Sequence, residues 1–301
     1  MLWLIVAIFS HFLFAIVVLV DKYLLVGLLP SPRIYAFYVG ALGILALALF
    51  PFGFFVPSPE IIIFAVLAGS FHIVGVIVYF SGLKRFEASR VVPAIGGFSP
   101  LFILGLTYLF LGERTALSLP DLTAFLLLIA GSILISWEKS KNITLKTLSI
   151  SALAALLFSY YFVLAKIVYL AHPFISGFIW SRVGAFLVAA ALLFFKDVRQ
   201  ELFMKQKTFD FKTWKVLLPN QIASSGAYLS QNWAIALAGV SYIAFIQALT
   251  GIQYAILLIF ALFFSVKLPQ FIREEISRKI LFQKISAILL IGLGLAFLVF
   301  K

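Results

Sequence analysis

Apolar residues gather into long runs along this chain, and short polar connections separate the runs. A membrane-spanning helix needs about 20 mostly apolar residues, and we find ten stretches of about that length. They lie at residues 2–20, 33–55, 60–82, 88–111, 119–137, 147–170, 174–195, 214–237, 240–264 and 282–300. The pattern predicts an all-α integral membrane protein with ten transmembrane helices. The first run has no basic residue before it and no small-residue cleavage site, so we expect a retained helix rather than a secretory signal.

Polar side chains inside four of these runs recur at helical spacing. The run 214–237 places Gln221, Ser225, Tyr228 and Asn232 on one stripe, with Pro219 available to break the helix near its start. The other three stripes are formed by Gln247, Thr250, Gly251 and Tyr254, by His72, Gly75 and Tyr79, and by Pro93, Gly96, Gly97 and Pro100. Such stripes indicate either the lining of a polar cavity or hydrogen bonding and close packing between helices. The runs 119–137 and 282–300 are almost free of polar residues, and we place them outside any cavity.

Composition agrees with a bilayer as the solvent. The chain is 64% hydrophobic and 11% charged, and its mean hydropathy is +1.16. No water-soluble core could bury that much apolar surface. The absence of cysteine excludes disulfides, thiol catalysis and cysteine-ligated metals.

The net charge of +12 marks topology rather than nucleic-acid binding. All but four of the 23 Lys and Arg residues lie at the connections after the first, third, fifth, seventh and ninth runs. Basic connections mark the cytoplasmic side, so we expect both termini to be extracytoplasmic. The four exceptions are Arg114, Lys166, Arg182 and Lys301.

Ionisable side chains inside a span are costly and therefore suggest function. Arg182 is a candidate for binding a substrate carboxylate or phosphate, and a structural ion pair is the alternative. Lys22 and Lys166 lie near cytoplasmic ends, where we expect them to extend toward headgroups. His11 and His72 are either packing residues or proton-coupling candidates. No Asp or Glu is expected deep in any run; in a carrier, this would leave facilitated transport, exchange or coupling through a histidine.

The chain also shows weak internal repetition. Shifting Lys22 onto Lys166 brings "FYVGALGIL" (37–45) onto "WSRVGAFLV" near 180–188, with Gly40 on Gly184. Because each copy would hold an odd number of helices, the second would be inverted. We therefore expect two five-helix units, 1–140 and 141–301, in a 5+5 inverted repeat; chance apolar similarity is the alternative.

One stretch carries a family likeness. Residues 79–136 run as a small-residue turn, a helix with a central Pro, a Gly-Glu-Arg at the helix end and an apolar helix with Ala-Gly. The residues that carry the pattern are Pro100, Gly112, Glu113, Arg114, Ala130 and Gly131. This stretch resembles an EamA-type repeat of the drug/metabolite transporter (DMT) superfamily, and "SRVGAF" with Arg182 extends the likeness. Phe264 and Ser265 depart from it in the second copy, as does Tyr38 in the first.

The resemblance implies a secondary carrier, often an exporter, for small metabolites such as amino acids. Glu113 and Arg114 would form a structural turn or take a substrate or proton role. We expect alternating access around a site near the midplane. The predicted substrate-binding residues are Arg182, Gln221, Ser225, Tyr228, Asn232, Gln247, Tyr254, His72 and Tyr79. His11 and His72 are the proton-coupling candidates, and no metal or cofactor is expected. A zwitterionic amino acid would place its carboxylate at Arg182 or the amides and its side chain at the tyrosines.

The expected partners are a small metabolite, the lipid bilayer, most simply the inner cell membrane, and a second copy of the chain. A lipid scramblase, a structural membrane protein and a sugar-phosphate or nucleotide-sugar carrier remain alternatives. The last would need paired basic residues in the ninth run, which has none. An enzyme is disfavoured because neither GxSxG nor HExxH occurs. The segment 267–284 resembles an amphipathic helix on the cytoplasmic interface.

Overall fold

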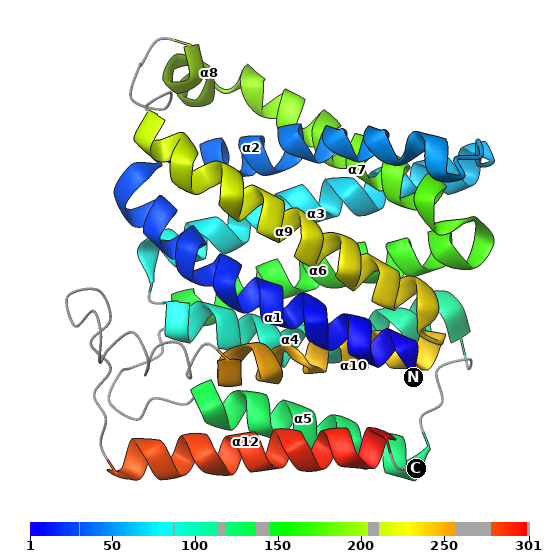
Figure 1. Cartoon of the computed structure of the whole chain (residues 1–301), viewed down its shortest axis with the longest axis vertical. Coiled ribbons are helices and arrows are strands. Elements are labelled where there is room, and N and C mark those ends of the chain that lie inside the picture. Colours follow the sequence, from blue (N-terminus) through cyan, green and yellow to red (C-terminus); the bar gives the residue numbers. More distant parts are fainter. Residues whose placement is uncertain are drawn as a thin grey trace.

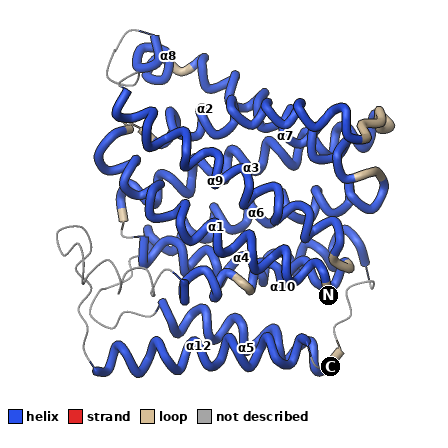
Figure 2. Tube along the Cα trace, in the orientation of Figure 1, coloured by secondary structure: helices blue, strands red, loops and turns tan. Residues whose placement is uncertain are grey.

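A computed structural model describes residues 1–29, 31–86, 88–112, 118–136, 145–203, 211–256 and 278–299. Within these residues the secondary structure is entirely helical, with short connections (Figures 1 and 2). The α-helices are α1 Leu2–Tyr23, α2 Pro32–Gly43, α3 Pro59–Arg85, α4 Ala88–Leu111, α5 Leu119–Ser136, α6 Leu145–Ala171, α7 Phe174–Ala191, α8 Lys196–Phe203, α9 Phe211–Leu237, α10 Ile243–Ala248 and α12 Arg278–Val299.

Membrane-spanning character is shared by most of these helices. Six described segments are long and apolar enough to cross a bilayer: Leu2–Tyr23, Pro32–Phe52, Pro59–Arg85, Ala94–Leu111, Leu145–Ala171 and Phe174–Phe194. Shorter apolar helices cover Leu119–Gly131, Val240–Ile256 and Ile285–Phe297. The polar residues of α9 lower its mean hydropathy, so it falls outside this group although it has 27 residues.

Two predicted runs are not continuous α-helices. The run 33–55 is α-helical only to Gly43 and continues as a 3₁₀ helix over Ile44–Phe52, which contains Pro51 and ends at Gly53. Gly53 has φ +114°, a left-handed conformation that suits glycine. The run 240–264 begins as a 3₁₀ turn, continues as α10 and is interrupted at Leu249 before further helix up to residue 256. Pro219, by contrast, does not break α9.

The short helix α8 was not expected from the apolar runs, because most of its residues are polar. Its Val198 and Leu202 are buried, and Asp197 at its start forms an ion pair with Arg33 at 3.0 Å. This helix therefore ties the connection after α7 to the start of α2. Most of the predicted amphipathic segment 267–284 lies outside the described residues, and α12 begins within it at Arg278.

The helices lie side by side and alternate in direction (Figure 1). In this view α1 and α3 end on the left, α2 and α6 end on the right, and α1 begins on the same side as α12 ends. Helix α9 packs along α1, and α3 packs along both α6 and α7. Helices α5 and α12 pair with each other at one end of the molecule.

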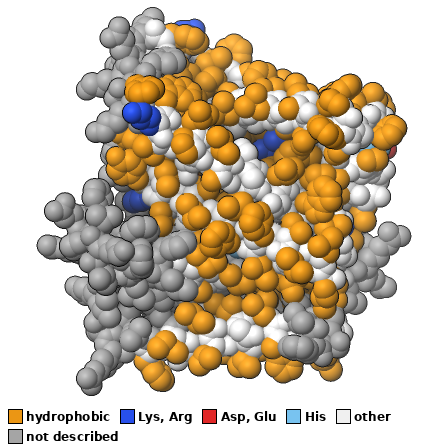
Figure 3. All heavy atoms as spheres, viewed as in Figure 1, with side chains coloured by type: hydrophobic (Ala, Val, Ile, Leu, Met, Phe, Trp, Pro, Cys, Tyr) orange, Lys and Arg blue, Asp and Glu red, His pale blue; other side chains and the backbone are white. Residues whose placement is uncertain are grey.

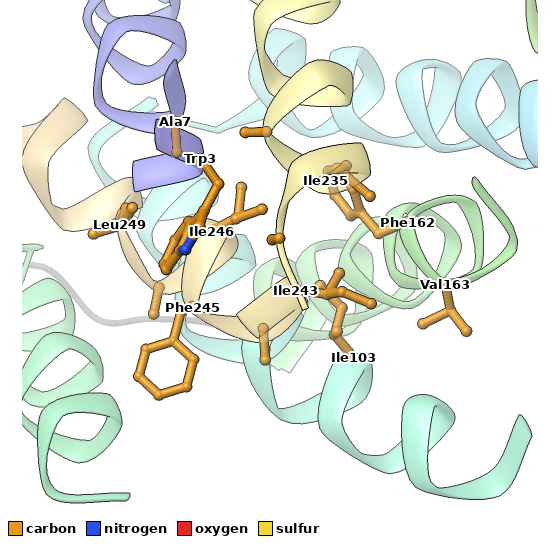
Figure 4. Packing of buried hydrophobic residues seen from close by; sticks show 14 of the residues in the cluster. Trp3, Ala7, Ile103, Phe162, Val163, Ile235, Ile243, Phe245, Ile246 and Leu249 are labelled. Atoms are coloured by element: carbon orange, nitrogen blue, oxygen red, sulfur yellow. The ribbon is translucent and has the colours of Figure 1, made fainter. Parts of the chain in front are cut away.

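Two apolar clusters hold the bundle together. The first joins the start of α1 to α4, α6, α9 and α10, and Figure 4 shows Trp3 and Ala7 lying close to Ile246 and Leu249. The second joins the end of α1 to α2 and α3, with Leu24, Tyr35 and Leu83 almost fully buried. Between the clusters, α1 turns its middle residues toward a cavity.

The pairing of α5 with α12 depends on close backbone approach. A β-carbon on Gly294 would lie 2.9 Å from Cγ of Leu128 and 3.0 Å from the carbonyl oxygen of Ala124. Small residues at such crossings let helices pack closely in lipid. Gly292, two residues earlier on the same helix, has no neighbour within 4 Å of that position.

We predict that Gly294→Val destabilises the folded protein by about 1–3 kcal/mol, because the added methyl groups overpack the α5–α12 contact. Gly292→Val is the matched control and should change stability by less than about 0.5 kcal/mol. Thermal melting of the purified protein in detergent measures both. Equal effects of the two substitutions would contradict the role assigned to this contact.

Candidate functional site

A cavity of about 530 Å³ lies among eight of the described helices. Residues of α1, α2 with its 3₁₀ continuation, α3, α4, α6, α7, α9 and the region of α10 line it, and α5 and α12 contribute none of its described lining. The exposed lining residues Leu45, Leu218 and Ile222 place its opening between the 3₁₀ segment and α9. In the space-filling view, basic atoms are visible between α2 and α9 among apolar side chains (Figure 3).

Arg182 forms the basic part of the cavity wall. Its guanidinium lies over the ring of Tyr228, with Cζ 3.8 Å from the ring centroid, and Nη2 donates a hydrogen bond to the Tyr228 hydroxyl. The residue is 6% exposed. Among the described residues no carboxylate pairs with it, and a cation over an aromatic face keeps most of its charge available to a ligand.

Aromatic rings surround this guanidinium. The ring of His72 contacts those of Tyr228 and Tyr161, with centroids 4.5 and 5.1 Å away. Phe158 and Phe178 complete the wall. Large apolar rings beside a charge lower the local polarity and so strengthen any electrostatic contact made there. The predicted residues Arg182, His72 and Tyr228 are thus brought together.

Several buried polar atoms around the cavity have no hydrogen-bond partner within the described part of the chain. They are Nε of Arg182, Nδ1 of His72, Nε2 of Gln247 and Oδ1 of Asn220. Buried polar groups are nearly always paired in folded proteins, so each unpaired atom calls for an explanation. A bound polar ligand would supply one for the atoms that reach the cavity.

Most of the other predicted site residues also line the cavity. Gln221, Ser225, Gln247, Tyr79 and His11 do so. The Nε2 atom of His11 donates to the carbonyl oxygen of Ile246 at 2.7 Å, and Gln253 lies 3.5 Å from Nδ1.

Asn232 and Tyr254 have structural contacts and do not appear in the lining. Asn232 is fully buried and accepts hydrogen bonds from the hydroxyls of Tyr161 and Tyr169, at 2.6 and 2.8 Å. It therefore joins α9 to α6. The Tyr254 hydroxyl donates to the carbonyl oxygen of Val92 at 2.5 Å. The helical stripe placed both residues near the cavity, but a neighbouring helix covers them.

Asp21 is a cavity residue that the sequence analysis missed. It lies in the last turn of α1, is 6% exposed and accepts hydrogen bonds at Oδ1 from the Tyr35 hydroxyl and from Nδ2 of Asn220, the latter at 2.7 Å. The expectation that no Asp or Glu lies deep in a run is not contradicted, because Asp21 lies at the end of α1, but the run 2–20 did not include this residue. The apolar run stops at Val20, whereas the helix continues to Tyr23.

Comparison with known proteins identifies the N-terminal part of the chain. Residues 1–137 match the model of the EamA-like transporter family, which belongs to the DMT superfamily. This part of the chain is EamA-like. The match confirms the resemblance predicted from the motif around Gly112. Together with the apolar helices, it supports a multi-pass membrane protein.

Solved structures extend the likeness to the whole chain at the level of fold. One of 27 matching chains, described only as "Crystal structure of protein", has a TM-score of 0.65 and 17% identity over 99% of this chain and 96% of that one. The search of curated proteins found no match.

The motif residues of the EamA-like part are structural where they are described. Gly112 has φ +67° and follows the last residue of α4, as predicted for a helix-ending glycine. A β-carbon on Gly131 would lie 2.6 Å from Ile291 on α12. Glu113 and Arg114 lie outside the described residues. No group of three His, Asp or Glu side chains that could hold a metal ion occurs in the described part of the chain.

Two lysines cap helix ends instead of extending toward headgroups. Nζ of Lys22 donates to the carbonyl oxygens of Leu83 and Phe86 at 2.5 and 3.1 Å. Nζ of Lys166, which is 2% exposed, donates to those of Ile235, Ala236 and Ala238. The final carbonyls of a helix lack internal partners and carry partial negative charge, so a lysine is a favourable cap. The expected snorkelling is therefore wrong for Lys166, and Lys22 is engaged by α3.

We predict that Lys166→Met lowers the free energy of unfolding by about 2 kcal/mol, because carbonyl oxygens at the end of α9 lose a charged donor. Methionine keeps the length of the apolar stem. Lys196→Met, at an exposed position, is the control and should have little effect. A thermal melt in detergent compares the two, and a Lys166→Met protein as stable as the control would contradict the capping role.

Proposed function

We propose that this protein is a secondary carrier that moves small metabolites, such as amino acids, by alternating access, and that it acts as an exporter. The observation that carries the proposal is the cavity among eight helices, at which Nε of Arg182 and other buried polar atoms have no hydrogen-bond partner within the described residues. The EamA-like family of the N-terminal part supports transport as the general activity.

The capping lysines support a 5+5 inverted repeat with units 1–140 and 141–301. Lys22 lies on the first helix of the first unit and caps its third helix, α3. Lys166 lies on the first helix of the second unit and caps α9, the third membrane-spanning helix of that unit. Equivalent residues thus make equivalent contacts. The packing of α1 on α9 likewise corresponds to the packing of α6 on α3.

An asymmetry between the two units supports alternating access. Helices α3 and α7 cross in close contact, because a β-carbon on Gly69 would overlap the Ser181 carbonyl oxygen and one on Gly184 would overlap that of Val66. Their counterparts, α9 and α2, touch at few residues, and the cavity opens beside them. If the two units swapped these arrangements, α2 would close onto α9 and α3 would separate from α7.

The chemistry of the lining favours a carboxylate over a phosphate as the anionic group of the substrate. Arg182 is the sole Lys or Arg in the described lining, and the amides of Gln221 and Gln247 are its neutral polar companions. For proton exchange, His72 is the better candidate, since its Nδ1 atom has no hydrogen-bond partner in the described part of the chain, whereas His11 is hydrogen-bonded to the Ile246 carbonyl.

Transport into liposomes tests the proposal. We predict that a panel of labelled metabolites includes at least one amino acid that accumulates by exchange, and that Arg182→Met raises its Kd about ten- to a hundredfold through loss of charge-assisted hydrogen bonds. The same ligand should raise the melting temperature of the wild-type protein. Lipid scrambling without solute movement would favour the scramblase alternative and reject the carrier.

Topology is tested separately, on the proposal that the protein lies in the inner cell membrane with both termini extracytoplasmic. The chain has no cysteine, so single cysteines can be introduced at exposed positions. We predict that Ser58→Cys, before α3, reacts with a membrane-impermeant thiol reagent in intact cells. Lys196→Cys, in the connection after α7, should react only after permeabilisation. The opposite pattern would invert the topology.

A further inference from the structure

The cavity has an acidic end as well as a basic one. We propose that its ligand is an elongated zwitterion, such as a basic amino acid with a terminal amine or a short peptide, whose ammonium binds at Asp21 and whose carboxylate binds at Arg182. This inference rests on the proposed carrier function and names its substrate class.

The acidic end consists of a carboxylate held by neutral groups. Both hydrogen bonds of Asp21 reach Oδ1, from Tyr35 and Asn220. Among the described residues no Lys or Arg pairs with Asp21. Lys22, its neighbour in sequence, is directed to the carbonyls of Leu83 and Phe86.

Further acceptors lie beside this carboxylate. Oδ1 of Asn220 is buried without a partner in the described part of the chain. Tyr79 is near enough to Asp21 to interact with it electrostatically and lines the same cavity. A carboxylate with neutral neighbours attracts a cationic group, and an ammonium supplies the donors that such acceptors lack.

The basic end presents the opposite charge. The Nε atom of Arg182 is buried and has no hydrogen-bond partner among the residues that the structure describes, and the guanidinium has the planar geometry that matches a carboxylate. Gly43 lies beside this side chain, since a β-carbon on Gly43 would be 3.6 Å from Cδ of Arg182.

Helix geometry gives the separation of the two ends. Three helices each contribute one residue near Asp21 and one near Arg182: Tyr35 and Gly43 of α2, Tyr79 and His72 of α3, and Asn220 and Tyr228 of α9. Each pair is seven or eight positions apart in sequence, which is about 11–12 Å along an α-helix.

This separation excludes an ordinary α-amino acid as a ligand that bridges both ends. One charge-assisted hydrogen bond of about 2.8 Å at each end leaves about 6 Å between the ligand's ammonium nitrogen and its carboxylate oxygen. In an α-amino acid these atoms are about 3 Å apart, whereas across five methylene groups they are about 8 Å apart in an extended chain and about 6 Å apart in a bent one. Val39 and Val76 line the cavity and offer apolar contact to such a chain.

The experiment compares four probes on the purified full-length protein in lipid nanodiscs: 6-aminohexanoate, hexanoate, hexylamine and norleucine. We expect 6-aminohexanoate to bind at least tenfold more tightly than each of the others. Because this comparison needs no substitution, it tests the proposal even if a variant fails to fold.

Substitutions then test which group of the ligand binds at Asp21 and which binds at Arg182. Asp21→Asn should weaken 6-aminohexanoate at least tenfold, to the level of hexanoate, and leave hexanoate unchanged. Arg182→Met should reduce 6-aminohexanoate to the level of hexylamine and leave hexylamine unchanged. Asp197→Asn, which removes an exposed carboxylate outside the cavity, is the control and should preserve all four affinities.

Two results would overturn the inference while leaving the carrier intact. One is transport of α-amino acids with no preference for 6-aminohexanoate over hexanoate. The other is an Asp21→Asn protein that keeps the probe preference but loses the pH or sodium dependence of transport, which would make Asp21 a site for a coupling cation. If no probe or amino acid binds or is transported, the proposed function itself fails.

Discussion

The cost of an ionised side chain inside a bilayer constrains this molecule more than any other effect. Insertion scales put that cost at about 2.5–3.5 kcal/mol for a central Arg, Lys or Asp. Asp21, Lys166 and Arg182 are nevertheless almost fully buried within helices, and none of them has an oppositely charged partner among the described residues. Each is held instead by neutral dipoles or by an aromatic ring. The helices are therefore packed around charged groups that can still attract an oppositely charged ligand.

The three charged residues have different roles because their hydrogen-bond partners differ. Lys166 meets the carbonyls of a helix end, which use its donors, so its charge stabilises packing. Arg182 meets a π-face and one hydroxyl, and its Nε has no hydrogen-bond partner within the described ranges. Asp21 accepts both of its hydrogen bonds at one oxygen. A charged side chain whose donors or acceptors are all used by the protein is structural, whereas one with unused donors or acceptors is available to a ligand. The neighbouring helices determine how many are used.

Sequence alone predicted what depends on local composition and missed what depends on neighbours. Hydropathy located the apolar segments, and helical periodicity placed Gln221 and Tyr228 on the face that lines the cavity. Periodicity put Asn232 on the same face, because it cannot tell that α6 covers that end of α9. Asp21 was missed because an apolar run ends at the first charge, whereas a helix ends where its hydrogen bonding stops. The contacts of Lys166 join α6 to α9, a pairing between segments about 70 residues apart that no local pattern contains.

The crossing of α3 and α7 has a consequence for how rapidly the molecule can rearrange. At Gly69 and Gly184 the two helices meet backbone to backbone, without side chains between them. Two glycines at such a crossing have no side-chain rotamers to change and no branched side chains to separate. The proposed alternating access would therefore part these two helices here without the repacking that larger residues would require.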